Sequence, residues 1–343
     1  MQRDVFIVGF GLAGWALTKA LQKQGISFVV FDSLSSSSSR VATGIYNPVV
    51  LKRFRAVWQA KTLMETSLPI YSQHSYKDVQ HSMPIYRVFS NIAEQNNWSV
   101  ATDNAELSSY LGSIVTKLNE HIATPFGLGK VQHTGWVNTN GLLNIAKQKL
   151  EREGCFFTES FHYDALTIKK NGVSYKKWNA KHVIFAEGIA VKNNPWFSKL
   201  PVTPNKGEWL MISCKGLRLD SIIKGPVFIV PHGNDVYRVG ATYQREFEHD
   251  LPTHENKQWL LSHFKKLVGL PCKVLHHGVG FRPTTPDRRP IIGCHPKHAN
   301  LWCVNGLGSR GVLWAPYLAN LLVNALNDKR IIPEALDVRR FFL

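Results

Sequence analysis

The sequence predicts an α/β protein with two domains, one of which is discontinuous along the chain. The chain has 343 residues, 44% of them apolar, which suffices for roughly two domains of about 150 residues each. A strand, a glycine turn, a helix and a second strand open the sequence. Buried-strand patterns recur in the middle and near the end, and alternating segments lie between them. We therefore expect a Rossmann-like dinucleotide-binding domain and a second domain built on an antiparallel sheet.

The first 32 residues have the pattern of a βαβ unit. Residues 5–9 are apolar and predict a buried strand, and residues 11–24 place apolar side chains at helical spacing. Gly25 is expected to end the helix, because glycine accepts the left-handed backbone conformation. Residues 27–31 predict a second strand that ends at Asp32.

A Gly-x-Gly-x-x-Gly motif connects this strand to this helix. Gly9 permits a tight turn, Gly11 lets the backbone approach a pyrophosphate, and Gly14 lets the helix lie close to the strand. The helix N-terminus would supply N–H donors and a partial positive charge. Asp32 is placed to accept ribose hydroxyls. The motif alone is typical of NAD and FAD sites alike, and a glycine turn without a ligand is the alternative.

The rest of the chain supplies further elements. The serine run at 35–39 favours a loop that faces a phosphate or a ribose, with a free linker as the alternative. Asn171-Gly172 predicts a hairpin turn. Helical patterns cover residues 55–67, 136–153, 259–267 and 312–326. Strand patterns cover residues 165–168, 181–188, 207–213, 227–230, 236–240 and 301–304.

These patterns divide the chain into five segments. The dinucleotide-binding domain is expected at residues 1–70, 130–200 and 275–343, and the substrate domain at 71–129 and 201–274. The chain contains no run of about 18 apolar residues that could span a membrane. Its five cysteines form no Cys-x-x-Cys pair, and its histidines show no ligand spacing, so we expect reduced thiols, no metal site and a soluble cytoplasmic protein.

The net charge of +17 is unusually high for a cytoplasmic enzyme. A field of this size attracts polyanions, and a partner of the size of a tRNA is one explanation. The basic residues are dispersed along the chain and form no nucleic-acid motif. A solvated basic surface without a partner is therefore the alternative.

The C-terminal third carries the most specific pattern. Residues 280–293 read Gly-Phe-Arg-Pro-Thr-Thr-Pro-Asp-Arg-Arg-Pro-Ile-Ile-Gly, and residues 301–311 read Leu-Trp-Cys-Val-Asn-Gly-Leu-Gly-Ser-Arg-Gly. Together with residues 183–188, 204–208 and 240–243, this order resembles the D-amino-acid oxidase and glycine oxidase family of FAD enzymes. The resemblance spans nearly the whole chain and implies a fold of the D-amino-acid oxidase type, with FAD as cofactor. In the sarcosine oxidase branch of the family that the chain resembles, a cysteine near the Pro-Asp motif tethers the flavin; residues 278–290 contain no cysteine, so the resemblance implies noncovalent FAD.

Within that family, residues 240–245 and 306–316 look most like one branch. It is the FAD oxidoreductase domain of the bifunctional enzymes that build 5-methylaminomethyl-2-thiouridine in tRNA. This branch oxidatively removes a carboxymethyl group from a wobble uridine, and the present chain would be a free-standing version. Oxidation of a free amino acid, such as glycine, proline or a D-amino acid, is the competing activity. Glu187 departs from the family's small or amide residue, which leaves a catalytically silent flavoprotein as a third possibility.

The resemblance assigns roles to individual residues. Arg282 would pair with the substrate carboxylate, because a guanidinium offers a planar bidentate fork; a structural ion pair is the alternative. Tyr243 could donate a hydroxyl to the same carboxylate or be a packed sheet residue. The glycine-rich loop at 306–311 would approach the flavin ring, and Arg310 would assist it or only anchor the turn. The expected cofactor site comprises Gly9, Gly11, Leu12, Ala13, Gly14, Asp32, Ser33, Thr43, Gly44, Gly188, Gly306, Leu307, Gly308, Ser309, Arg310 and Gly311.

Overall fold

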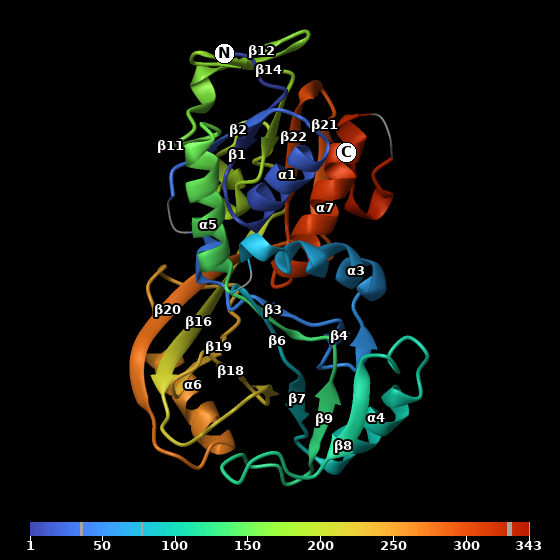
Figure 1. Ribbon diagram of the computed structural model, residues 1–343, viewed down its shortest axis with the longest axis vertical. Coiled ribbons are helices and arrows are strands. Elements are labelled where there is room, and N and C mark those ends of the chain that lie inside the picture. Colours follow the sequence, from blue (N-terminus) through green and yellow to red (C-terminus); the bar gives the residue numbers. More distant parts are fainter. Residues whose placement is uncertain (35–36, 77, 328–330, 343) are drawn as a thin grey trace.

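A computed structural model describes residues 1–34, 37–76, 78–327 and 331–342. Two large sheets, one above the other in Figure 1, organise the molecule. The upper sheet has six strands in the order β11-β2-β1-β15-β22-β21. Its strands are Val5–Val8 (β1), Phe28–Asp32 (β2), Phe156–Thr158 (β11), His182–Phe185 (β15), Ile291–His295 (β21) and His298–Asn305 (β22). All neighbours pair in parallel except β21 with β22, as expected for a Rossmann-like domain.

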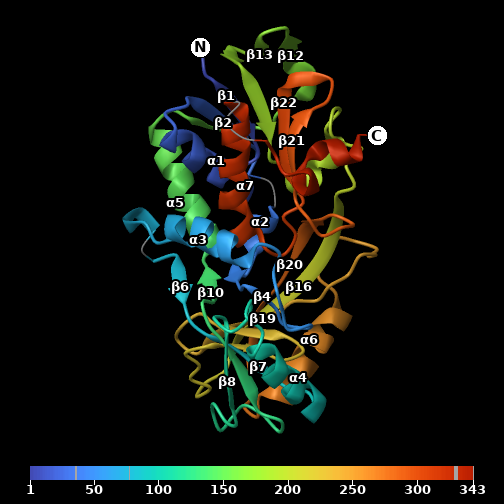
Figure 2. The same cartoon turned by 90° about the vertical axis from the view of Figure 1, so that its right-hand side faces the viewer.

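Alternating side chains of the six-stranded sheet enter two different cores. Ile7 and Val30 face helices α1 (Leu12–Lys23), α5 (Thr139–Arg152) and α7 (Gly311–Leu326). Phe6 and Phe31 face the other way, toward a small sheet of β12 (Leu166–Lys169), β13 (Gly172–Tyr175) and β14 (Trp178–Ala180). Figure 2 shows the three helices together on one side of the sheet. The predicted βαβ unit is confirmed, and so is the predicted hairpin, although its two turn residues are Lys170 and Asn171 because Gly172 already pairs with Lys169.

The lower sheet has eight strands in the order β20-β16-β19-β18-β17-β7-β9-β8. Its pairs are antiparallel apart from β17 with β7. Helix α6 (His254–Leu267) covers one part of it and α4 (Ile92–Thr102) another. The strands are Ile85–Val88 (β7), Leu111–Val115 (β8), Leu128–Val131 (β9), Thr203–Ser213 (β16), Ile222–Lys224 (β17), Phe228–Pro231 (β18), Val236–Gly240 (β19) and Lys273–Thr284 (β20).

Short elements join the two sheets. Helix α3 (Ala60–Tyr71) lies between them in Figure 1, near the hairpin of β4 (Val49–Val50) and β5 (Arg55–Ala56). A three-stranded sheet contains β3 (Ile45–Tyr46), β6 (Gln80–Ser82) and β10 (Gly135–Val137). The remaining elements are the short helix α2 (Ser38–Val41) and the 3₁₀ turns His74–Tyr76, Tyr163–Ala165, Gly188–Asn193, Glu334–Leu336 and Val338–Phe341.

Several expected helices begin at other residues. The helix expected at 136–153 begins at Thr139, because Asn138 caps it through Gly141 N–H (3.0 Å) while 135–137 pair as β10. The helix expected at 55–67 begins only at Ala60, since residues 55–56 pair with β4. The helix expected at 259–267 begins at His254, capped by Thr253. Thr253 N–H also donates to the buried carboxylate of Glu208 (2.9 Å).

The sheet topology places one expected domain boundary at a different residue. Strand β20 runs to Thr284 within the eight-stranded sheet, so residues 275–284 lie with the substrate-domain strands and not with the six-stranded sheet. This difference arises because β20 pairs along its whole length with the long strand β16. We propose the two-domain division with this boundary moved toward residue 285. No helix in the described ranges is both long and apolar enough to cross a membrane.

Candidate flavin and substrate site

The N-terminal glycine turn has the geometry that the motif predicts. Gly9 has a φ of +98°, and a Cβ there would lie 2.5 Å from the carbonyl oxygen of Ala186. A Cβ on Gly14 would lie 2.0 Å from the carbonyl oxygen of Gly9. These contacts are too short for any side chain, so the turn and the first helical turn require glycine. The close fit holds the N-terminus of α1 at the carboxyl end of β1.

The N-terminus of α1 faces the serine segment. Leu12 N–H donates to the hydroxyl of Ser39 (3.0 Å), and a Cβ on Gly11 would lie 2.8 Å from the same hydroxyl. Ser39 thus shows that an oxygen acceptor fits against this helix end, as a pyrophosphate oxygen would. A pyrophosphate that used this N–H would require the Ser39 side chain to rotate away. Of the five serines, Ser35 and Ser36 lie outside the described residues.

Asp32 ends β2 beside the glycine turn. One carboxylate oxygen accepts from Phe10 N–H (2.5 Å) and the other from Leu34 N–H (2.7 Å). The backbone of the turn therefore fixes the orientation of the carboxylate. Asp32 and the following Ser33 lie where the motif places the ribose-binding acid, while Ala13 is packed in the first turn of α1. The structure brings these residues together with Gly9, Gly11 and Gly14, as expected.

A second glycine segment precedes β3. Gly44 has a φ of +74°, and a Cβ there would lie 1.9 Å from the carbonyl oxygen of Val137. The preceding carbonyls of Val41 and Ala42 accept hydrogen bonds from the guanidinium of Arg238, on β19. Gly44 is therefore tied to β10 of the three-stranded sheet, and the two residues before Thr43 are tied to the eight-stranded sheet.

The loop between β22 and α7 is the third glycine-rich segment. Gly306 and Gly308 have φ values of +71° and +56°, and Gly308 N–H donates to the carbonyl of Pro283 on β20 (2.9 Å). Gly311 packs against α1, because its Cβ position lies 3.1 Å from the Cδ1 of Leu12. The loop, which includes Leu307 and Ser309, thus joins the N-terminal turn to the strand that carries Arg282. Gly188 joins the same region, since Asn305 Nδ2 donates to its carbonyl (2.8 Å).

Arg310 anchors this loop. Its guanidinium donates to the carbonyl of Asn47 (3.0 Å), and burial lowers its pKa to about 10. The anchoring role considered for this arginine is therefore visible in the structure. A direct role toward the flavin stays a prediction.

The side chain of Arg282 extends from β20 and lies over the backbone of the neighbouring strand β16, at a glycine. Its Nη1 donates to Asn205 Oδ1 (2.9 Å) and to the carbonyl of Thr242 (3.3 Å). The guanidinium lies over Gly207, where a Cβ would meet Nη2 at 2.3 Å and Nη1 at 2.4 Å. Burial lowers the pKa of this guanidinium, and within the described part of the chain it has no carboxylate partner. The structural ion pair considered as an alternative is therefore absent there.

Tyr243 follows β19 and lies beside this arginine. The Arg282 guanidinium carbon is 5.6 Å from the centre of the Tyr243 ring. The tyrosine side chain is 57% exposed, so it is not the packed sheet residue of the alternative interpretation. The two residues predicted to hold a carboxylate are thus neighbours.

Arg238 and Gly207 were missed by the sequence reasoning. Arg238 is buried, with its guanidinium carbon 3.6 Å from the centre of the Trp209 ring. Burial and the positive charge of Arg282 lower its pKa to about 9. A buried and a partly buried guanidinium whose charges repel one another favour an anion nearby. Gly207 lies within the 204–208 motif, and its lack of a side chain could have indicated that another group packs on the strand there. Arg238 lies inside a predicted strand, and no feature of the sequence marks it as a site residue.

Glu187, which departs from the family pattern, is hydrogen-bonded to two side chains of the fold. Its carboxylate accepts from the hydroxyl of Tyr163 (2.7 Å) and from Asn194 Nδ2 (2.9 Å). Burial raises its pKa from 4.5 to about 7. Tyr163 packs against the core on the far side of the sheet from α1, and Asn194 is fully buried. The Glu187 carboxylate is therefore hydrogen-bonded within the fold.

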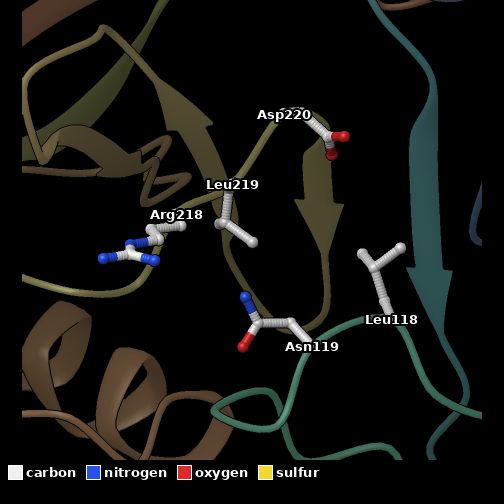
Figure 3. Close-up of a pocket in the computed structure, with 5 residues that line it drawn as sticks. All are labelled: Leu118, Asn119, Arg218, Leu219 and Asp220. Carbon is white, nitrogen blue, oxygen red and sulfur yellow. The ribbon is translucent and has the colours of Figure 1, made fainter.

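An open hollow lies elsewhere, near the β8–β9 connection at the far end of the eight-stranded sheet. Figure 3 shows its lining residues, Leu118, Asn119, Arg218, Leu219 and Asp220. Leu219 and Asn119 point toward one another, whereas Arg218 and Asp220 are directed to opposite sides. None of these residues belongs to the motifs described above. In the described ranges, no group of three or more His, Cys, Asp or Glu side chains could hold a metal ion.

The parallel sheet, the glycine turn and its terminal acid have the arrangement of a dinucleotide-binding domain, and the adjoining antiparallel sheet carries Arg282. The family model described as "FAD dependent oxidoreductase" matches residues 4–325. The chain therefore belongs to this family, whose members use FAD. The glycine turn, the donors of α1 and Asp32 fit such a cofactor.

Curated relatives are similar over nearly the whole chain. The tRNA 5-methylaminomethyl-2-thiouridine biosynthesis bifunctional protein MnmC of Marinobacter nauticus is 21% identical, covering 98% of this chain and 57% of that protein. The bifunctional protein ThiO/ThiG of a Nostoc species is 25% identical, covering 97% and 54%. The chain thus spans little more than half the length of these relatives.

Solved structures share the fold. Glycine oxidase from Geobacillus kaustophilus has a TM-score of 0.80 at 19% identity, covering 99% of this chain and 98% of that one. The L-proline dehydrogenase from P. horikoshii has a TM-score of 0.82 at 15% identity, covering 99% and 98%. At these identities the likeness concerns the fold, and it confirms the predicted architecture.

Proposed function

We propose that this protein oxidises the C–N bond of a secondary amine that bears a carboxymethyl group, and that the amine belongs to a modified tRNA uridine. The observation that carries the proposal is Arg282. Its guanidinium is partly buried without a carboxylate partner among the residues described, while its Nη1 donates to Asn205 and Thr242. A substrate carboxylate would complete a charge-assisted pair there.

The chain's own residues would bind and orient this substrate. Arg282 and Tyr243 would hold the carboxylate, and the loop at 306–311 would place backbone N–H groups near the cofactor. The cofactor that these residues would hold, FAD, would supply the acceptor for a hydride from the carbon next to nitrogen. Loss of that hydride from carbon and of the N–H proton to solvent converts the amine R–NH–CH₂–COO⁻ into the imine R–N=CH–COO⁻. Addition of water releases R–NH₂ and glyoxylate, so atoms and electrons balance.

The tRNA identity of the substrate rests on separate support. The chain is similar to tRNA-modifying MnmC proteins and carries a net charge of +17. A free amino acid is the second candidate, because ThiO/ThiG and solved glycine oxidases are similar to the chain as well. Both candidates share the carboxylate and the oxidised C–N bond. They differ in what the nitrogen carries.

One experiment separates them. The purified holoenzyme is incubated with tRNA bearing 5-carboxymethylaminomethyl uridine, and in parallel with glycine, proline and D-alanine. The proposal predicts loss of the carboxymethyl mass from the tRNA together with release of glyoxylate. Rapid oxidation of a free amino acid and an unchanged tRNA would establish the second candidate instead.

A further inference from the structure

The β4–β5 hairpin carries a concentration of positive charge. Residues 33–64 contain no aspartate or glutamate. Four basic residues in this segment are exposed: Lys52, Arg53, Arg55 and Lys61. Phe54 packs edge-on against Trp98, with ring centres 5.2 Å apart. The basic side chains therefore extend from an anchored turn.

An exposed aromatic platform lies directly after the hairpin. The side chain of Trp58 is 37% exposed, although tryptophan is usually well buried. One neighbour is the Trp314 ring, stacked at 5.7 Å, and another is the guanidinium of Arg289, 5.3 Å from the Trp58 ring centre. Planar indole and guanidinium groups are the surfaces on which unpaired nucleobases stack.

This platform adjoins the site described above. Trp314 lies in the first turns of α7, directly after the loop at 306–311. The carbonyl of Arg289 accepts a hydrogen bond from Thr285 (2.7 Å), which follows the Arg282 strand. The nearby Asp287 is paired with Arg340 (3.3 Å), which offsets its negative charge. A polymer bound on the platform would thus lie next to the segments that hold the flavin and the carboxylate.

We propose that Lys52, Arg53, Arg55, Trp58 and Arg289 form a single-stranded RNA docking surface, called here the hairpin surface. The basic side chains of the hairpin contact phosphates, and one unpaired base stacks on Trp58 beside Arg289. The mixture of exposed arginines with an exposed indole fits RNA, because phosphates and bases alternate along a single strand. This inference rests on the proposed tRNA substrate and names the surface that recruits it.

The test measures affinity for an unmodified tRNA transcript as a function of salt. Replacing Lys52, Arg53 and Arg55 by serine should weaken binding and flatten the log–log salt slope by about two to three units. Trp58→Ala should weaken binding roughly tenfold with little change in slope. The matched control replaces Lys169, Lys170 and Lys177, three exposed lysines of the small sheet, by serine. All variants should retain the oxidised-flavin spectrum.

Each outcome has a defined meaning. Equal losses of affinity in the hairpin triple variant and the control triple variant would show diffuse attraction and overturn the hairpin surface. Binding to phosphatidylserine vesicles through the same side chains, without tRNA binding, would also overturn it. Turnover of the modified tRNA by the native protein tests the proposed function separately. A native protein that removes no carboxymethyl group from the modified tRNA, but binds tRNA through the hairpin surface, would refute the function and leave the surface intact.

Discussion

The Arg282 guanidinium lies on the backbone of Gly207, so Gly207→Ala perturbs the arginine without replacing it. The added Cβ would lie 2.3 Å from Nη2, whereas ordinary contacts begin near 3.4 Å. The guanidinium must therefore move by about 1 Å. The φ of Gly207 lies outside the left-handed region, so alanine fits the strand backbone. The clash falls on the flexible end of a side chain, and the fold should survive.

The expected effect on catalysis is large. A displacement of about 1 Å in a substrate-positioning group costs roughly 100-fold in kcat/KM, equivalent to about 2.7 kcal/mol. The hydrogen bonds from Arg282 to Asn205 and Thr242 would also lengthen, and losing each would cost about 0.5–1.5 kcal/mol. The loss should appear for every substrate that carries the carboxylate.

The assay is anaerobic flavin reduction by the active substrate, with the flavin content measured first. Gly269→Ala is the matched control, because a Cβ there meets no atom within 4 Å. Gly207→Ala should retain FAD and lose about two orders of magnitude in kcat/KM, while Gly269→Ala should match the native protein. Native kinetics in Gly207→Ala would refute the placement of the carboxylate at Arg282.

Substitutions at three positions have defined outcomes. Arg282→Ala should retain FAD and lose about 3 kcal/mol or more of transition-state stabilisation, measured as kcat/KM. Arg282→Lys should recover only part of this loss, because an ammonium lacks the planar fork of a guanidinium. Unchanged steady-state rates in Arg282→Ala would exclude the carboxylate-binding role. Gly11→Val should abolish FAD binding, and acid should release the native flavin into the supernatant, whereas yellow colour in the pellet would contradict a noncovalent cofactor. Because burial raises the pKa of Glu187 to about 7, its ionisation removes roughly 3 kcal/mol of stability as pH rises from about 4.5 to 7. The free energy of unfolding of Glu187→Gln, measured in urea, should therefore rise relative to that of the native protein between pH 5 and pH 8. A difference between the two free energies that does not change with pH would argue against that raised pKa.

The dinucleotide-binding half was largely predictable from sequence because its signals are local. The Gly9, Gly11 and Gly14 spacing, the apolar strands and Asp32 each act within one βαβ unit. Helix starts were less predictable. Asn138 and Thr253 cap helices, but polar residues flanking an apolar pattern give several possible starts.

The substrate half depends on contacts between distant segments. The position of Arg282 over Gly207 follows from the β16–β20 register, which joins residues about 75 apart in sequence. Arg238 reaches the carbonyls of Val41 and Ala42 from β19, some 196 residues away. No local pattern in the sequence encodes such a contact. The hydrogen bond between Glu187 and Tyr163 is not encoded locally either.

The central claim is tested most directly by the nucleosides of tRNA from a strain that lacks this gene. The account predicts that 5-carboxymethylaminomethyl uridine derivatives accumulate, and that the native gene removes them. The Arg282→Ala gene should fail to do so while its product retains FAD. An unchanged nucleoside profile in the deletion strain, or full rescue by Arg282→Ala, would contradict the account.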